Sequence, residues 1–302
     1  MLRVRPIYLD NRVGVELGAR LGRLMKRVSA ELFCEVPCDV AEGPFWYEGR
    51  LHWVDIFRCT LFSCDNAGND LTSIVLPMHL GCVAPWQRHF IAGTQAGIGF
   101  LFPDAHFERL RESPRLPPGM RCNDGKLDPA GRFWVGTTTY DFQTGEGALY
   151  RVDRDLKVER VLDGLTLPNG LDWDASASSF YLIDTYARRL DCFDWEMASG
   201  QLSNRRPAFT LSDDWGLADG MTIDRAGRLW IAFWQGGRVL GLDARSGRPL
   251  VRIDVPAILT TSCCLDVTGN TLFITTARSH LREEQLKDQP LAGSVFCADI
   301  PY

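Results

Sequence analysis

The sequence of 302 residues predicts an all-β fold, a six-bladed β-propeller, on three observations. A strand-like run with a central aromatic residue recurs six times, Asp/Gly turns precede several of these runs, and the composition holds Gly 28, Phe 16, Trp 9 and Tyr 7. Aromatic residues favour strands and glycine favours tight turns, so this composition indicates many short strands. Length alone would also allow two domains.

The repeat has a period of about 44 residues. Its central aromatics are separated by 37, 44, 47, 49 and 43 residues and are Trp53, Phe90, Trp134, Tyr181, Trp230 and Phe273. Hairpin signals with Asp and Gly precede the runs, most clearly at residues 128–132 and 224–228. A further strand-like run follows most of them, so each unit has room for the four strands typical of a propeller blade.

Six such units account for residues 31–302 as one domain. The run at residues 31–36 has no blade of its own, and we expect it to supply the outer strand of the last blade, pairing near residues 294–297. This pairing closes the ring and removes exposed sheet edges.

Residues 1–30 are predicted to be a basic N-terminal extension outside the propeller. Seven Lys and Arg against two acidic residues give it a net charge of +5, so the remainder of the chain, at -5 overall, carries -10. The extension is expected to be a short amphipathic helix or poorly ordered, because five apolar residues share one helical face: Leu17, Leu21, Leu24, Met25 and Val28. A start at Met25 and an organellar transit peptide are the alternatives, and low serine content disfavours the second.

Composition excludes several classes of function. A net charge of -5 argues against nucleic acid as a partner, and the sequence has no apolar stretch of about 18 residues that would cross a membrane. The ten cysteines include no CxxC pair, which excludes zinc-ribbon and thioredoxin motifs. We expect them to be reduced and buried, which points to the cytoplasm. The expected partner is a small molecule, and the expected assembly is a monomer or weak oligomer.

The repeat also predicts which residues face the central channel. Counting back eleven residues from five of the aromatics, and twelve from Tyr181, gives one polar residue per blade: Glu42, His79, Asn123, Asn169, Asp219 and Ser262. Two facing carboxylates, Glu42 and Asp219, would repel unless a cation or proton lay between them. With the amide oxygen of Asn169 they form an oxygen set that suits Ca²⁺ or Mg²⁺, with Mn²⁺ and Zn²⁺ still open. His79 is left outside this metal set.

Several motifs resemble those of the SMP-30/gluconolactonase/regucalcin-like (LRE) family. They lie, in family order, at residues 41–46, 121–126, 167–171, 218–221, 260–264 and 276–278. The resemblance spans residues 31–302 and implies a six-bladed propeller that acts as a metal-dependent sugar lactonase. It implies that Glu42, Asn169 and Asp219 bind the metal.

The same resemblance implies that Arg121 and Asn123 contact sugar hydroxyls, and Tyr140 is expected to join them. The family also carries an acidic residue after the third aromatic strand. Asp141 or Glu146 is the candidate for that position, and Asp141 is expected to bind substrate.

The predicted reaction is hydrolysis of a gluconolactone-like aldonolactone to its aldonic acid, in carbohydrate metabolism. A divalent ion would polarise the lactone carbonyl and acidify a water, and Asp219 is the candidate catalytic base. GxSxG, HExxH and P-loop motifs are absent from the sequence. Two alternatives stay open: a non-enzymatic calcium-binding regulatory protein of the regucalcin type, and a paraoxonase-like hydrolase of bulky esters, which would need an apolar rim.

Overall fold

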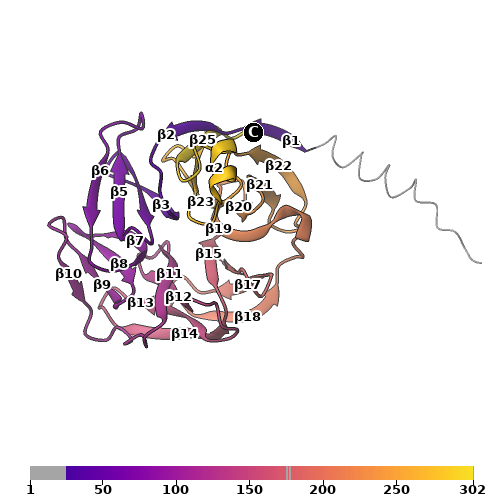
Figure 1. Cartoon of the computed structure of the whole chain (residues 1–302). Helices are drawn as coiled ribbons and strands as arrows, with labels where there is room; N and C mark the ends of the chain where they lie inside the picture. The colour runs from indigo at the N-terminus through magenta and orange to yellow at the C-terminus, as the bar shows by residue number, and fades with distance from the viewer. Residues whose placement is uncertain (1–24, 175, 177, 302) are drawn as a thin grey trace, which may run out of the picture.

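The chain forms a ring of β-sheets around a central channel (Figure 1). The structure is a computed structural model that describes residues 25–174, 176 and 178–301. Within them the strands make six sheets, arranged as a six-bladed β-propeller, as the sequence predicts. The inner strand of each blade packs against the inner strands of its neighbours, and β23 packs against β3 to complete the ring.

The first three blades follow one another along the chain, each ordered from the innermost to the outermost strand. The first comprises β3 (Ala41–Tyr47), β4 (Arg50–Asp55), β5 (Thr60–Cys64) and β6 (Thr72–Val75). The second comprises β7 (Leu80–Trp86), β8 (His89–Thr94), β9 (Gly97–Leu101) and β10 (Phe107–Arg109). The third comprises β11 (Met120–Leu127), β12 (Phe133–Thr139), β13 (Gly147–Val152) and β14 (Val158–Leu165).

The last three blades continue this order. The fourth comprises β15 (Pro168–Trp173), β16 (Ser179–Asp184), β17 (Arg189–Trp195) and β18 (Leu202–Pro207). The fifth comprises β19 (Leu217–Ile223), β20 (Arg228–Trp234), β21 (Arg238–Asp243) and β22 (Pro249–Asp254), with the 3-10 helix η1 (Asp213–Trp215) before it. The sixth comprises β23 (Thr260–Leu265), β24 (Thr271–Thr276) and β25 (Val295–Asp299), with α2 (Glu283–Asp288) before β25. In the described part of the chain, no helix is long and apolar enough to cross a membrane.

The N-terminal strand β2 (Glu31–Cys34) closes the ring. It pairs antiparallel with β25, with Glu31 opposite Cys297 and Leu32 opposite Phe296. β2 therefore becomes the outermost strand of the last blade, and Figure 1 shows it beside β25. The prediction for this segment is confirmed.

A strand within the predicted extension differs from the expectation. β1 (Lys26–Ser29) pairs parallel with β22 and becomes a fifth strand of the fifth blade. Arg27 Nη2 lies 2.8 Å from Asp254 Oδ2, which ties the strand to that edge. The unpaired backbone groups of β22 explain the docking, since an open edge accepts another strand. The helix predicted to include Met25 and Val28 is wrong at that end, because Val28 lies in β1, and the part of it within residues 1–24 lies outside the described residues.

Local turn chemistry connects the repeat to its core. Asp128 Oδ2 accepts hydrogen bonds from Arg132 Nε at 2.6 Å and from Trp134 Nε1 at 2.9 Å. Asp224 makes the equivalent bonds in the fifth blade, at 2.5 and 2.9 Å. One carboxylate therefore holds both the turn and the central tryptophan, which explains why Asp, Arg and Trp recur at this spacing.

Apolar side chains fill the spaces between blades. Trp53, Trp134 and Trp230 are fully buried, Tyr181 and Phe273 are buried, and Phe90 is half-buried. All ten cysteines are free thiols, and eight are buried. The cysteines therefore act as small core residues, as their positions in apolar strands predict.

Candidate metal and substrate site

Every inner strand of the propeller contains a β-bulge. The six register shifts lie between Glu42 and Phe45, Leu80 and Cys82, Cys122 and Gly125, Pro168 and Leu171, Ala218 and Met221, and Thr260 and Cys263. A bulge leaves residues unpaired and turns their side chains away from the regular alternation of a strand. The bulges therefore explain how strands whose other side chains are mostly buried in the core present polar groups to the channel.

Three of the predicted channel residues, Asn123, Asn169 and Asp219, are the first unpaired residues of their bulges, and Glu42 is the last paired residue before its bulge. All four are at least 93% buried, and all four line one cavity of about 430 Å³. Arg121 and Tyr140 line the same cavity. The structure thus brings together six of the seven predicted site residues.

Two of the six predicted channel residues, His79 and Ser262, do not line this cavity. In the sixth blade Thr261 takes the place of Ser262, because six residues separate the paired Leu265 and Leu272, whereas five separate the paired Ile223 and Leu229 of the fifth blade. Counting back a fixed eleven residues from Phe273 therefore stops one residue short of Thr261.

In the second blade the equivalent residue is Gly81 and not His79. The bulge there holds one residue where most others hold two. A Cβ at Gly81 would lie 2.3 Å from the carbonyl oxygen of Cys122, so only glycine fits. His79 lies just before β7, where its Nδ1 is 2.5 Å from the hydroxyl of Tyr140.

The two buried carboxyl groups favour a bound cation. Burial, and then the charge of Asp124, raises the pKa of Glu42 to about 8. Burial, and then the charge of Glu42, raises the pKa of Asp219 well above its ordinary value. A divalent cation between these carboxylates would remove their repulsion, and Asn169 adds a neutral oxygen. This set fits a metal such as Ca²⁺, although nowhere in the described chain do three or more His, Cys, Asp or Glu side chains form a metal-binding group.

A chain of hydrogen bonds fixes the amide groups of the site. Arg121 Nη1 donates to Asn123 Oδ1 at 2.6 Å, and Asn123 Nδ2 donates to Asn169 Oδ1 at 3.0 Å. Asn169 Nδ2 donates to Thr185 Oγ1 at 3.0 Å, and this hydroxyl donates to the carbonyl of Ala218 at 2.8 Å. Three blades are linked in this way. Because carbonyl oxygens have two lone pairs, Asn169 Oδ1 keeps one for a metal.

Arg121 is held between aromatic rings at the cavity wall. Its guanidinium carbon lies 5.9 Å from the ring centre of Phe57 and 5.8 Å from that of Tyr140. Its Nε is buried and has no hydrogen-bond partner among the described residues. A buried donor without a partner is costly, so a ligand oxygen in this cavity would satisfy it.

The predicted acidic residues of the 138–147 loop do not reach the cavity. Asp141 is exposed and its Oδ2 accepts a hydrogen bond of 2.8 Å from Gln143 Nε2, and Glu146 is also exposed. Phe142 adopts a φ of 54°, and this turn places Tyr140 and Phe142 in the wall. The side chain of Asp141, which lies between them in the sequence, is exposed to solvent.

Sequence reasoning missed most of the upper wall. It consists of residues at or just beyond the end of the second strand in five of the six blades, namely Phe57, Phe142, Tyr186, Trp234, Gln235 and His280. Because every second strand ends on the same face of the ring, the residue following each aromatic strand would have revealed this wall.

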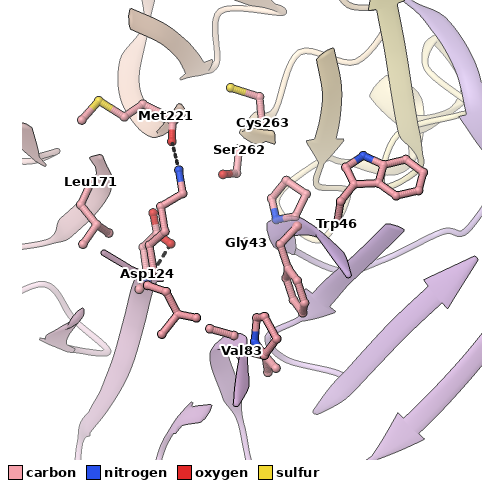
Figure 2. A pocket seen from close by; sticks show the side chains of 15 residues that line it. Gly43, Trp46, Val83, Asp124, Leu171, Met221, Ser262 and Cys263 are labelled. Atoms are coloured by element: carbon pink, nitrogen blue, oxygen red, sulfur yellow. Dashed lines mark hydrogen bonds between the residues drawn. The ribbon is translucent and has the colours of Figure 1, made fainter. Parts of the chain in front are cut away.

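A second cavity of about 200 Å³ lies in the next layer of the channel (Figure 2). Asp124 and Ser262, which follow the site position in their bulges, line it. Lys126 Nζ lies 2.6 Å from Asp172 Oδ2 and 3.5 Å from the carbonyl of Met221. A lysine ammonium therefore neutralises an aspartate beneath the candidate site.

Comparisons with known proteins identify the family of this chain. Residues 40–278 match the model of the family described as "SMP-30/Gluconolactonase/LRE-like region". The chain belongs to this family. It is 32% identical over 278 residues to "Putative sugar lactone lactonase YvrE" of Bacillus subtilis, covering 90% of this chain and 95% of that protein. It is 36% identical over 279 residues to Regucalcin of Danio rerio, covering 90% and 94%.

A solved structure supports the fold. The crystal structure of a calcium-binding protein, regucalcin, from Agrobacterium tumefaciens superposes with a TM-score of 0.84 at 24% identity. The match covers 90% of this chain and 94% of that one. The chain therefore shares the propeller fold with that protein over nearly all of its described residues.

Proposed function

We propose that this protein is a metal-dependent sugar lactonase that hydrolyses an aldonolactone to its aldonic acid. One observation carries the proposal: two buried carboxyl groups, Glu42 and Asp219, share a cavity of about 430 Å³ with the Arg121–Asn123 pair. The first pair suits a divalent cation and the second suits an oxygen-rich ligand. The relative named as a sugar lactone lactonase supports the same substrate class.

Glu42, Asn169 and Asp219 would hold the metal. When bound, a divalent ion supplies Lewis-acid polarisation of the lactone carbonyl and a lower pKa for a nearby water. Calcium is the favoured ion because the ligands are all oxygens and because one solved structure of the same fold is that of a calcium-binding protein. Mg²⁺, Mn²⁺ and Zn²⁺ are the other candidates.

The chain's own groups then carry out the hydrolysis. Asp219 accepts a proton from water, whose oxygen bonds to the lactone carbonyl carbon. The ring C–O bond breaks, and the departing oxygen takes the proton and becomes the hydroxyl of the acid. Arg121 holds the substrate by donating hydrogen bonds, and Asn123 accepts one through Oδ1, because both of its N–H groups are already used by Pro168 and Asn169. With Tyr140 as a further contact, the ester then faces Asp219.

A second candidate function is calcium binding without turnover, as a regulatory protein of the regucalcin type. The name of the 36% identical relative favours it. Arg121 and Asn123 distinguish the two, because a metal-binding role alone does not need a partnerless arginine donor in the same cavity.

Hydrolysis assays decide between these functions. Purified protein stripped with EDTA would be supplied with Ca²⁺, Mg²⁺, Mn²⁺ or Zn²⁺ and offered a panel of aldonolactones. Metal-restored hydrolysis supports the lactonase, whereas tight calcium binding without hydrolysis supports the regulatory protein. Aryl esters belong in the panel because the aromatic wall includes Phe57 and Trp234. Ten free thiols support a reducing compartment, and we propose the cytoplasm.

A further inference from the structure

An arginine-lined cavity lies on the fifth blade, apart from the candidate lactone site. Its volume is about 430 Å³, within the range of small-molecule sites. Its walls combine three arginines with apolar groups: Arg238, Arg248, Arg252, Trp215, Leu240 and Pro249. Met25 lines it as well.

The strand register explains why the arginines gather there. Arg252 of β22 lies opposite Leu240 of β21, and Arg238 lies two residues before Leu240. Side chains at such positions share one face of a sheet. Two guanidinium groups therefore stand beside each other above an apolar floor, and Arg248 precedes the same strand.

These positive charges are only partly neutralised. Asp254 uses Oδ1 for Arg252 Nε at 2.5 Å and Oδ2 for Arg27 Nη2 at 2.8 Å, so both of its oxygens are engaged. The Arg238 side chain makes one hydrogen bond to a described residue, from Nε to the carbonyl of Gly236 at 2.7 Å. In the described chain, the Arg248 side chain makes no hydrogen bond or ion pair within normal distance.

The neighbouring positive charges affect the pKa of Arg238. Burial, and then the charge of Arg252, lowers the pKa of Arg238. Folding has therefore placed cations beside each other at an energetic cost. Such a cost is commonly recovered when an anion binds.

We propose that this cavity binds a small molecule bearing a phosphate group, with the phosphate between Arg238 and Arg252 and the rest of the molecule on Trp215. Guanidinium forks match phosphate oxygens bidentately, and two of them suit a dianion better than a single carboxylate. Trp215 and Leu240 offer an apolar surface for the carbon skeleton. A sugar phosphate and a nucleoside monophosphate both have this chemistry.

Titration calorimetry on the full chain tests the site. The probes are inorganic phosphate, glucose 6-phosphate and AMP, with glucose and acetate as the uncharged and carboxylate comparisons. We expect saturable binding of the phosphate probes that weakens as salt rises, and no binding of glucose. Tighter binding of glucose 6-phosphate than of AMP would identify a sugar phosphate, and the reverse a nucleotide.

Matched variants locate the binding. Arg238→Gln and Arg252→Gln should each weaken the phosphate probes at least tenfold, whereas Arg225→Ala, at an exposed arginine of the same blade, should leave binding unchanged. If Arg238→Gln unfolds, Trp215→Leu should still weaken glucose 6-phosphate or AMP more than inorganic phosphate. Absence of saturable binding, or equal binding by the Gln variants and the unaltered protein, would overturn the proposal. Because the readout is binding, it stands apart from lactone hydrolysis.

Discussion

Asn123 Nδ2 donates a 3.0 Å hydrogen bond to Asn169 Oδ1, and this bond joins the third and fourth blades at the site. Asn123 thereby links the arginine proposed to hold substrate to the amide proposed to hold metal, since its own Oδ1 accepts from Arg121. The two halves of the site are therefore mechanically connected. Changes at Asn123 should disturb both, whereas changes at Arg121 should act mainly on substrate.

Replacing Asp219 with Ala should abolish metal binding and lower lactone turnover by about 10²–10⁴-fold, because the variant loses both a ligand and the base. Calorimetry with Ca²⁺ and a lactone assay measure the two effects. Asp141→Ala is the matched control, since that carboxylate is exposed and bonded to Gln143, and its activity should be unchanged. Unaltered lactonase activity in the Asp219→Ala protein would contradict the assignment.

Asn123→Ala should raise KM for the lactone and also weaken metal binding, by about tenfold each, the effect of one lost buried hydrogen bond to each side. Arg121→Lys keeps the charge but loses the fork, so it should raise KM while metal affinity changes little. Kinetics and calcium titration on both variants check this. An Asn123→Ala protein that loses only substrate affinity would show that the two halves are not coupled.

The pKa of Glu42 predicts how metal-free protein responds to pH. The pKa rises from 4.5 to about 8 in the folded state, mainly through burial. Between these values the folded protein binds a proton that the unfolded chain has released, so stability falls as pH rises through this window. Melting of EDTA-treated protein should show Tm falling from about pH 5 to pH 8, as that linkage requires.

Calcium should reverse this trend, because it binds the deprotonated carboxylates and stabilises the folded state more at higher pH. Glu42→Gln removes the titrating group, so its metal-free Tm should depend less on pH. A metal-free Tm that rises over the same range would show that Glu42 is ionised in the folded protein without a cation.

Local signals in the sequence predicted the architecture well. The hydrogen bond between Asp128 and Trp134 requires an aspartate in the turn and a tryptophan at a fixed distance after it. This requirement explains why the repeat can be recognised in the sequence. The pairing of β2 with β25 followed from a strand without a blade. The position of β1 could not be predicted, because docking of a strand on the edge of β22 depends on which edge the fold leaves open.

A fixed count of eleven residues works in the third and fifth blades because their hairpins have equal lengths. Asn123 and Asp219 lie eleven residues before their aromatics, but one extra hairpin residue shifts the sixth blade to Thr261. In the second blade the bulge is one residue shorter, and Gly81 occupies the equivalent position. A search for one polar residue per blade does not find a glycine. The prediction that Asp141 reaches the cavity was wrong because the loop turns at Phe142, which has a positive φ, and the sequence does not reveal this turn.

The Lys126–Asp172 pair below the site offers a test of the channel itself. Its side chains retain 32% and 16% exposure, because the lysine faces the small cavity of Figure 2. Lys126→Met leaves Asp172 with hydrogen bonds from Thr222 and the Ile223 amide but without a cation. We expect a loss of about 1–3 kcal/mol in the free energy of unfolding, between the values for surface and buried pairs.

Asp172→Asn alone should destabilise by a similar amount, and the double variant by less than the sum, as urea unfolding and a double-mutant cycle would measure. Arg160→Met at an ion pair whose side chains are 52% and 71% exposed is the control and should change stability by less than about 0.5 kcal/mol. Strictly additive effects at Lys126 and Asp172 would mean that the ammonium does not neutralise this aspartate. In that case the charge balance beneath Glu42 and Asp219 would have to come from the metal alone.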